Sequence, residues 1–157
     1  GERIGRLEEA VQVITALMAH ERATFEGRYY RLREATYRPL PVQRPHPPVW
    51  IGAGGERKML PLVARRADVW HGFGSVSSLS RKSRLLDRLA EEAGRDPSSI
   101  GRSTNLSLSE PWDEVRRTAE SLHAAGFGTL IASWPSEGWS RIEEFVERVL
   151  PDLQEMD

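Results

Sequence analysis

The fold of this chain is decided by one stretch of sequence, Pro48-Val49-Trp50-Ile51-Gly52-Ala53-Gly54-Gly55-Glu56-Arg57-Lys58. An apolar run leads into three glycines within four positions, and a helical pattern follows, so the stretch predicts a short buried strand, a turn and a helix. Glycine carries no Cβ and therefore lets the backbone of the turn approach a ligand closely. A helix that starts here would point free N–H groups and its positive dipole end at the turn, which suits an anion such as a phosphate. These residues leave open a second interpretation, in which the turn needs glycine only for its own geometry.

The strand-then-helix pattern recurs along the rest of the chain. Strands are predicted at 49–52, 67–71, 103–109 and 128–133, and helices at 55–66, 78–93, 112–125 and 140–153. Alternation of this kind predicts an α/β fold with parallel strands, right-handed crossovers and helices that cover the sheet. About four βα units are half of the eight that close a (β/α)8 barrel, so the pattern leaves open half a barrel or a small open sheet. In both cases ligands bind at the carboxyl ends of the strands, where the glycine turn lies.

Residues 1–48 follow a different pattern. Apolar residues at helical spacing predict an amphipathic helix over 4–19, and aromatic residues around Glu26-Gly27 predict a small hairpin within 24–38. Five prolines between 39 and 48 predict an extended surface segment. The expected organisation is a helix (1–20), a hairpin with a proline-rich strap (21–48) and four βα units (49–157).

Composition excludes several classes of function. A formal net charge of −1 gives no electrostatic reason to expect nucleic acid or a membrane surface as a partner. The chain contains no cysteine, and its four histidines are scattered without metal-ligand spacing, so no metal is expected. Without a signal peptide or a long apolar stretch, the expected location is the cytoplasm. The chain starts at Gly1 without a methionine and enters a helix directly, and we interpret it as a piece of a longer protein.

Five segments carry a resemblance to a known family. They are R-L-E-E-A (6–10), T-F-E-G-R-Y-Y (24–30), P-V-Q-R-P-H-P-P-V-W-I-G-A-G-G-E-R (41–57), A-R-R-A-D-V-W-H-G-F-G (64–74) and A-G-R-D-P (93–97). In this order they resemble the luciferase-like monooxygenase family, and within it the branch of coenzyme F420-dependent oxidoreductases. A final V-L-P-D-L (149–153) is similar to the last helix of that family. The resemblance implies a TIM-type (β/α)8 barrel about twice as long as this chain, of which residues 1–157 would be the C-terminal half.

The resemblance also implies where the cofactor phosphate lies, whether the cofactor is F420 or FMN. The implied binding residues form the loop after the first of the four strands: Gly52, Ala53, Gly54, Gly55 and Glu56, with Arg57 as a charge partner. Backbone N–H groups would do most of the binding, as a small anion nest at a helix start. Catalytic residues stay unknown, because the family's other cofactor segments and most of its proton-transfer groups belong to the N-terminal half.

Three ring-bearing side chains near the carboxyl ends of later strands are candidates for the substrate pocket, namely Trp70, His71 and Trp134. His71 can hydrogen-bond the cofactor or a substrate carbonyl, because imidazole titrates near neutral pH. Its alternative role is a polar pocket wall without chemistry, and many relatives carry Asn at this position. Trp134 either packs against the cofactor or caps the barrel, and the sequence does not separate these roles.

The function implied by the resemblance is hydride transfer between F420, or a flavin, and a small organic substrate. One alternative is an FMN-dependent monooxygenase that activates dioxygen with flavin reduced by a partner reductase. Another is a non-catalytic half-barrel that self-associates as a homodimer through its open sheet. As the cofactor carries the redox chemistry, the protein would supply the phosphate anchor, orientation and exclusion of solvent.

Other polar residues are interpreted as structural. Asp68 stands at the start of its strand, at the end of the sheet away from the ligand edge. Arg65 and Arg66 are expected on a solvated helix face. Ser133 and Ser136 have no G-x-S-x-G context or paired base, which argues against a hydrolase triad.

Overall fold

The computed structural model describes residues 1–155 and contains a two-stranded and a four-stranded sheet. Helix α1 (Glu2–Ala19) is followed by the antiparallel hairpin of β1 (Ala23–Glu26) and β2 (Arg31–Ala35). The remaining elements alternate: β3 (Trp50–Gly52), α2 (Met59–Arg66), β4 (Val69–His71), α3 (Val76–Glu92), β5 (Gly101–Leu106), α4 (Trp112–Ala124), β6 (Thr129–Ala132), α5 (Trp139–Arg148) and α6 (Leu150–Gln154). A single 3-10 turn, Pro97–Ser99, precedes β5.

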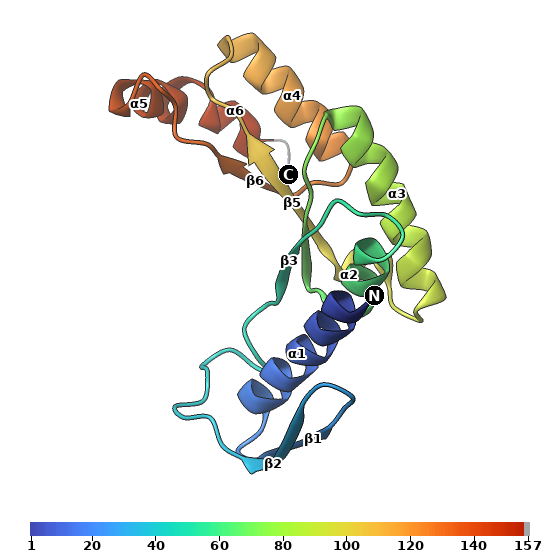
Figure 1. Ribbon diagram of the computed structural model, residues 1–157. Helices are drawn as coiled ribbons and strands as arrows, with labels where there is room; N and C mark the ends of the chain where they lie inside the picture. The colour runs from blue at the N-terminus through green and yellow to red at the C-terminus, as the bar shows by residue number, and fades with distance from the viewer. Residues whose placement is uncertain (156–157) are drawn as a thin grey trace.

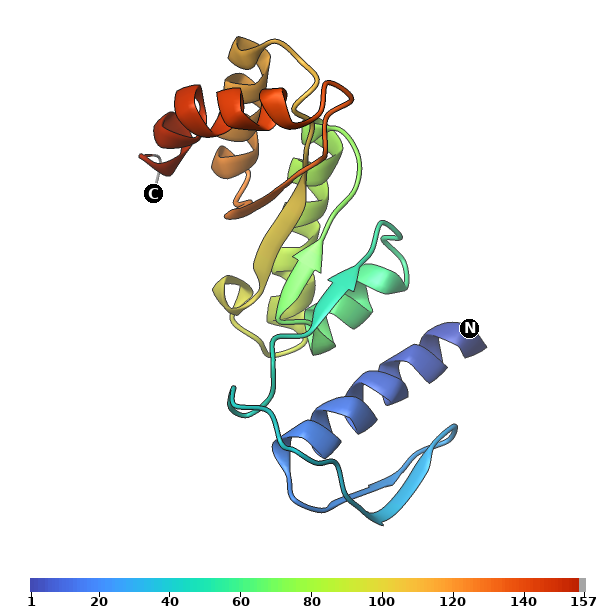
Figure 2. The same cartoon turned by 90° about the vertical axis from the view of Figure 1, so that its left-hand side faces the viewer.

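The larger sheet has the order β3-β4-β5-β6, and every neighbouring pair is parallel. The predicted α/β class with four βα units is therefore confirmed. Helices α2, α3 and α4 lie together on one side of this sheet (Figure 1). Figure 2 looks onto the other side, where no helix lies in front of the strands. The four units curve as half of a (β/α)8 barrel does, with helices outside and the concave face open.

The core fills the space between the sheet and its helices. Ile51 and Trp70 are in register on neighbouring strands, and both point into this layer, where Trp70 contacts Phe127 with ring centroids 5.6 Å apart. A second buried cluster lies under the last two helices and includes Leu106 and Phe145. Because side chains alternate along a strand, the neighbours of these residues, such as His71, face the opposite, concave side.

Two predicted helix boundaries are wrong, for identifiable reasons. The helix after the glycines begins at Met59 rather than 55, because glycine costs about 1 kcal/mol in a helix and residues 56–58 form a turn instead. The helix expected over 140–153 is split at Val149 into α5 and α6. Pro151 explains the break, since it has no N–H to donate and its ring clashes with the carbonyl of residue 147 in a continuous helix. The strand predicted at 103–109 lies at Gly101–Leu106.

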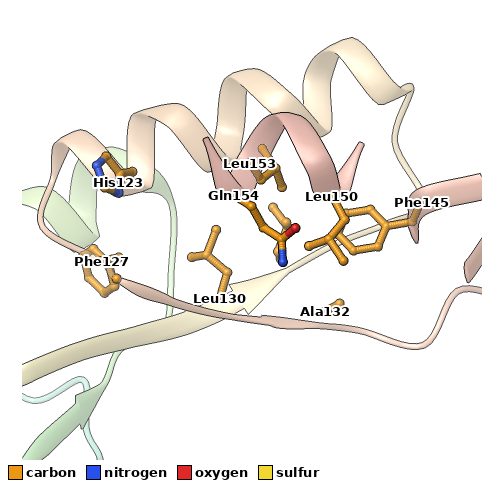
Figure 3. A pocket seen from close by; sticks show the side chains of 10 residues that line it. His123, Phe127, Leu130, Ala132, Phe145, Leu150, Leu153 and Gln154 are labelled. Atoms are coloured by element: carbon orange, nitrogen blue, oxygen red, sulfur yellow. The ribbon is translucent and has the colours of Figure 1, made fainter. Parts of the chain in front are cut away.

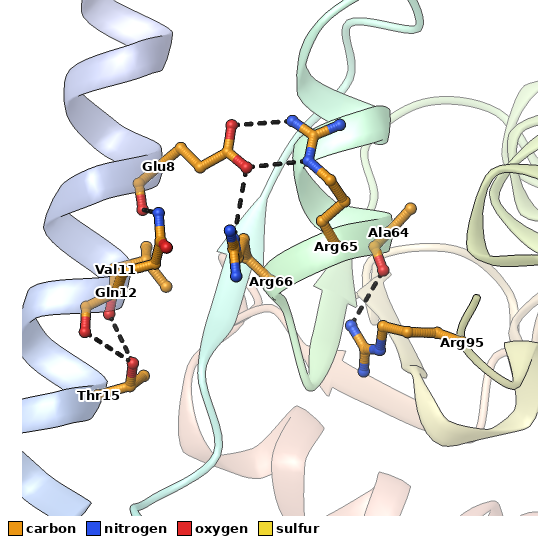
Figure 4. Close-up of polar contacts among 8 residues, drawn as sticks. All are labelled: Glu8, Val11, Gln12, Thr15, Ala64, Arg65, Arg66 and Arg95. Carbon is orange, nitrogen blue, oxygen red and sulfur yellow. Dashed lines mark hydrogen bonds and ion pairs between the residues drawn. The ribbon is translucent and has the colours of Figure 1, made fainter. Parts of the chain in front are cut away.

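Helix α1 is attached to the sheet layer through an ion-pair cluster (Figure 4). Glu8 accepts hydrogen bonds from Nε and Nη2 of Arg65 at 2.9 and 2.8 Å, and from Nε of Arg66 at 3.4 Å. Arg65 is exposed and Arg66 is partly exposed, as predicted for a solvated helix face, but both arginines also pair with Glu8 of α1. They link α1 to α2 across 57 residues of sequence, a contact that no local pattern reveals.

Two further polar contacts close the ends of the βα units. Arg95 donates to the carbonyls of Ala64 and Ala67 at 3.0 and 2.8 Å, and so satisfies acceptors at the C-terminal end of α2. Asp68 accepts from the backbone N–H of Val49 at 2.7 Å and fastens the starts of β3 and β4 together. The structural role predicted for Asp68 is confirmed. No helix within residues 1–155 combines the length and the apolar character that a membrane crossing requires.

We expect Glu8→Gln to destabilise the chain by about 1 kcal/mol at neutral pH, because it removes one charge from a partly buried cluster. The hydrogen bonds from Arg65 hold the pKa of Glu8 below its ordinary value of about 4.5. A depressed pKa contributes stability above pH 4.5, and that contribution is lost as the pH falls through the pKa of the folded state.

The measurement is urea unfolding of the wild type and Glu8→Gln between pH 3 and 7. The difference between the two should be constant above about pH 5 and shrink below it. The matched control is Glu2→Gln, which removes an exposed carboxylate that pairs with Arg6 on the same helix, and it should have a smaller effect. A Glu8→Gln difference that does not change with pH would contradict the assignment.

Candidate functional site

The loop of residues 53–58 leaves the carboxyl end of β3, at the edge of the sheet where ligands bind in folds of this class. Both backbone groups of the first loop residue, Ala53, are hydrogen-bonded to residues of β4. Ala53 donates its N–H to the carbonyl of His71 at 3.1 Å, and its carbonyl accepts from Nε1 of Trp70 at 2.9 Å. Ala53 is buried, whereas Gly54 and Gly55 are exposed. The loop therefore leaves the core at a fixed point and in a fixed direction.

Beyond Ala53 the loop presents a series of unpaired donors. Among residues 1–155, the backbone N–H groups from Gly54 to Lys58 donate no hydrogen bond. The carbonyl of Gly55, in contrast, accepts from both Met59 and Leu60 at 3.1 and 3.0 Å. Lys58, at the N-cap of α2, gives the helix no side-chain cap. Consecutive free N–H groups at an uncapped helix start form the donor arrangement that binds anions.

The glycines of this loop are not required by the fold. None of Gly52, Gly54 and Gly55 has a positive φ. A Cβ on Gly54 would meet only Nζ of Lys82, at 3.8 Å, and a Cβ on Gly55 would meet only the side chain of Met59, at 3.8 Å. Both are ordinary contacts. Neither a positive φ nor a steric clash therefore requires glycine at these positions, and the absent Cβ atoms leave an open space above the N–H groups, called the cradle below.

The next loop shows what a structurally required glycine looks like. A Cβ on Gly72 would lie 2.6 Å from Cδ2 of Leu79 and 2.9 Å from the ring of Trp70. Gly74 adopts a φ of +129°, which side chains disfavour. Packing and backbone conformation thus require glycine in this second loop, whereas neither requires it at Gly54 and Gly55.

Charges around the loop are mainly positive. Arg57 and Lys58 are exposed on the loop itself, and Arg81 and Lys82 reach it from α3. The carboxylate of Glu56 receives Nη1 and Nη2 of Arg81 at 2.9 and 2.8 Å, which lowers the pKa of Glu56. Of the predicted binding residues, Glu56 can therefore offer a ligand only its backbone N–H. An anion of phosphate size fits this combination of free donors, open space and cations.

The predicted pocket residues separate into two groups. Trp70 is fully buried between sheet and helices, so its expected place on the pocket wall is corrected: it supports the loop from behind. His71 faces the concave side, where its Nδ1 lies 3.1 Å from Oγ of Ser103. Its ring packs edge to face on Phe73 at 4.8 Å, and Phe73 lies over Gly52. His71 therefore adjoins the loop, and Trp70 lies behind it.

Trp134 lies at the far edge of the sheet from the glycine loop. It follows β6, whereas the loop follows β3, and the two strands are the opposite edges of the sheet. Its ring is 68% exposed and packs on Trp139 with centroids 6.0 Å apart. The structure therefore brings His71 close to the glycine loop, but not Trp134. No group of three or more His, Asp or Glu side chains within the described residues is arranged to hold a metal ion.

A separate cavity of about 230 Å³ lies on the helix side of the sheet (Figure 3). Its lining is mostly apolar: Leu106, His123, Phe127, Gly128, Leu130, Ala132, Phe145, Leu150, Leu153 and Gln154. The volume is below the about 300–1,000 Å³ that is usual for ligand pockets, and no charged side chain lines it. The cavity therefore does not suit a phosphorylated cofactor and is unrelated to the glycine loop.

Sequence reasoning missed Arg81 and Lys82. Their helical spacing suggested nothing beyond a charged helix face, and the pair of Arg81 with Glu56 spans 25 residues. The only available signal is indirect, since a βα unit packs its helix beside the preceding helix. That rule brings α3 next to α2 but does not specify which residues of α3 reach the loop.

The comparisons with known proteins agree on one family. The profile described as luciferase-like monooxygenase matches residues 1–140. The F420-dependent glucose-6-phosphate dehydrogenase of Intrasporangium calvum is 47% identical over 146 residues, covering 78% of this chain and 40% of that protein. The FMNH2-dependent dimethylsulfone monooxygenase of Pseudomonas putida is 27% identical over 138 residues, covering 83% and 38%.

Among solved structures, the coenzyme F420-dependent tetrahydromethanopterin reductase from Methanopyrus kandleri superposes with a TM-score of 0.82 at 15% identity, covering 96% of this chain and 63% of that one. This likeness concerns the fold. The chain spans about half the length of the curated relatives it matches. With a family profile over most of its residues and an F420-dependent enzyme at 47% identity, the chain belongs to the luciferase-like monooxygenase family, which includes F420-dependent and FMN-dependent enzymes.

Proposed function

We propose that this chain supplies the phosphate anchor of an oxidoreductase that transfers hydride between coenzyme F420 and a small organic substrate. The observation that carries the proposal is the loop 54–58, whose N–H groups have no acceptor among residues 1–155 and whose glycines the fold does not need. The F420-dependent relative at 47% identity supports F420 over other phosphorylated ligands. When bound, the deazaflavin or flavin ring supplies the redox chemistry.

The residues of this chain have defined tasks in the proposal. The backbone of Gly54 and Gly55 donates to the phosphate oxygens, and Arg57 adds a positive charge at the rim. His71 stands on the concave face beside the loop, with Ser103 fixing its Nδ1 and leaving Nε2 available for a cofactor or substrate oxygen. Phe73, itself 51% exposed, lies over Gly52 at the start of the loop.

A second candidate is an FMN-dependent monooxygenase, with flavin reduced by a partner reductase. It is favoured by the FMNH2-dependent relative, and the same loop suits the phosphate of FMN. Fluorescence titration of the encoded protein with F420 and with FMN separates the candidates, with any sequence that precedes residue 1 included. Tighter binding of F420 supports the first, and tighter binding of FMN the second.

We expect Gly54→Val to lower the affinity for the preferred cofactor at least about tenfold, equal to 1.4 kcal/mol, because the added side chain enters the cradle. The same change should alter the free energy of unfolding by less than about 0.5 kcal/mol, since a Cβ there meets only Lys82 at 3.8 Å. Binding is measured by titration and stability by urea unfolding.

Two variants serve as controls for this experiment. Gly128→Val alters a glycine that also has open space around it but lies away from the loop, and it should leave cofactor affinity unchanged. Gly72→Ala should instead cost about 1–3 kcal/mol of stability, because its Cβ would overlap Leu79. Unchanged affinity of Gly54→Val for both cofactors would remove the phosphate assignment.

We expect residues 1–157 on their own to show no turnover, because the concave face is open and Trp50, Phe73 and Ile131 are 48%, 51% and 44% exposed. Such apolar exposure also favours self-association, as the half-barrel alternative requires. Sedimentation over a concentration series and a cofactor-dependent assay of the 157-residue chain test both points. Measurable turnover would contradict the first expectation, and a monomer at every concentration would contradict the second.

A further inference from the structure

Two adjacent residues of α3 approach the glycine loop from outside. Arg81 pairs with Glu56 through two hydrogen bonds of 2.9 and 2.8 Å. Lys82 places Nζ 3.8 Å from the point where a Cβ of Gly54 would stand. A helix that carries no residue of the loop therefore lines the cradle with two cations.

The two cations differ in what they contact. Both guanidinium nitrogens that Arg81 turns to the loop are used by the two carboxylate oxygens of Glu56. Lys82 is partly buried and forms no hydrogen bond or ion pair with any residue between 1 and 155. Its charge acts on Glu56 without a direct contact, as one of the causes that lower the pKa of that carboxyl, so the N–H groups of the ammonium are available to an anion in the loop.

We propose that Lys82 is a direct ligand of the cofactor phosphate, and that Arg81 is a positioning residue that neutralises Glu56 and holds its carboxylate off the phosphate. This inference rests on the proposed function, because it needs a phosphate in the loop. The backbone N–H groups would orient the phosphate through hydrogen bonds, and Lys82 would add a full positive charge, which backbone dipoles lack. Without Arg81, the carboxylate of Glu56 would stand as a like charge beside the bound anion.

The proposal makes the site selective for the phosphorylated form of the cofactor. FMN and riboflavin differ only in the phosphate, so their affinity ratio isolates that group. If the protein prefers the deazaflavin, the equivalent pair is the deazaflavin 5′-monophosphate and the same chromophore without its phosphate. The ratio responds to a phosphate ligand, whereas a residue that only stabilises the fold changes both affinities together.

The first test is Lys82→Met in the encoded protein, with binding measured by fluorescence titration. We expect the affinity for the phosphorylated ligand to fall about tenfold, while that for the unphosphorylated ligand stays unchanged. Lys82→Arg should recover most of the loss. The matched control is Arg84→Met, which removes a positive charge from the same helix at a side chain that donates to Ser80 instead. It should leave the ratio unchanged.

The second test uses the pair of Arg81 and Glu56. Arg81→Met should weaken binding of the phosphorylated ligand, because it leaves the carboxylate uncompensated. The double variant Arg81→Met/Glu56→Gln should restore it, because the repelling charge is gone. A structural role for the pair predicts the opposite, since the double variant would lose the same contact as the single one.

The outcomes separate this inference from the proposed function. If Gly54→Val loses the phosphorylated ligand and Lys82→Met does not, the loop assignment stands and the role of Lys82 is wrong. If Lys82→Met lowers the affinities for both forms equally, Lys82 is a packing residue and the inference fails. If neither variant changes the ratio, the phosphate does not bind in this loop and both proposals fall.

Discussion

The hydrogen bond from the indole of Trp70 to the carbonyl of Ala53, at 2.9 Å, is the constraint on which the site depends. Trp70 is fully buried, and a buried indole N–H that finds no acceptor costs about 1–3 kcal/mol. The acceptor available is the first carbonyl beyond β3, so the core fixes the point at which the loop starts. The N–H of Ala53 is used at the same time by the carbonyl of His71. With both groups of Ala53 occupied, the donors that follow are directed away from the core.

The same arrangement brings two loops together at this edge of the sheet. Parallel strands end side by side, so the loops after β3 and β4 are neighbours by construction. Gly72 and Gly74 allow the second loop to pass close over Trp70 and Leu79, and Phe73 between them covers Gly52. The packing of the loop after β4 thus also determines which side chain contacts the start of the loop after β3.

Much of the fold follows from the sequence, because its determinants are local. Val49 to Gly55 contains both the strand and its turn, and the same pattern repeats along the chain. Pro151 marks the break between α5 and α6. Because proline has no N–H to donate, its position in the sequence is enough to predict where that helix is interrupted.

Which side chains of β4 face the helices is harder to predict from the sequence. Trp70 and His71 are adjacent and both polar-tipped, and only the packing of Trp70 on Phe127 shows which one faces the helices. Contacts such as Glu8 with Arg65, or Glu56 with Arg81, join segments that are far apart in sequence. They produce no periodic pattern of residues, so they cannot be predicted from the sequence alone.

Glycine is informative here because the structure separates its two uses. A glycine that is needed by the fold shows a positive φ or a neighbour too close for a Cβ, as Gly74 and Gly72 do. A glycine that shows neither, such as Gly54, contributes nothing to the folded chain and loses more backbone entropy on folding than alanine would. The fold therefore gains nothing at this position in return for that entropy. The open space above Gly54 is available to a ligand, and the unpaired N–H groups and cations around it favour a negatively charged one, as the proposed phosphate is. The family likeness adds which anion is proposed, namely the phosphate of F420 or FMN.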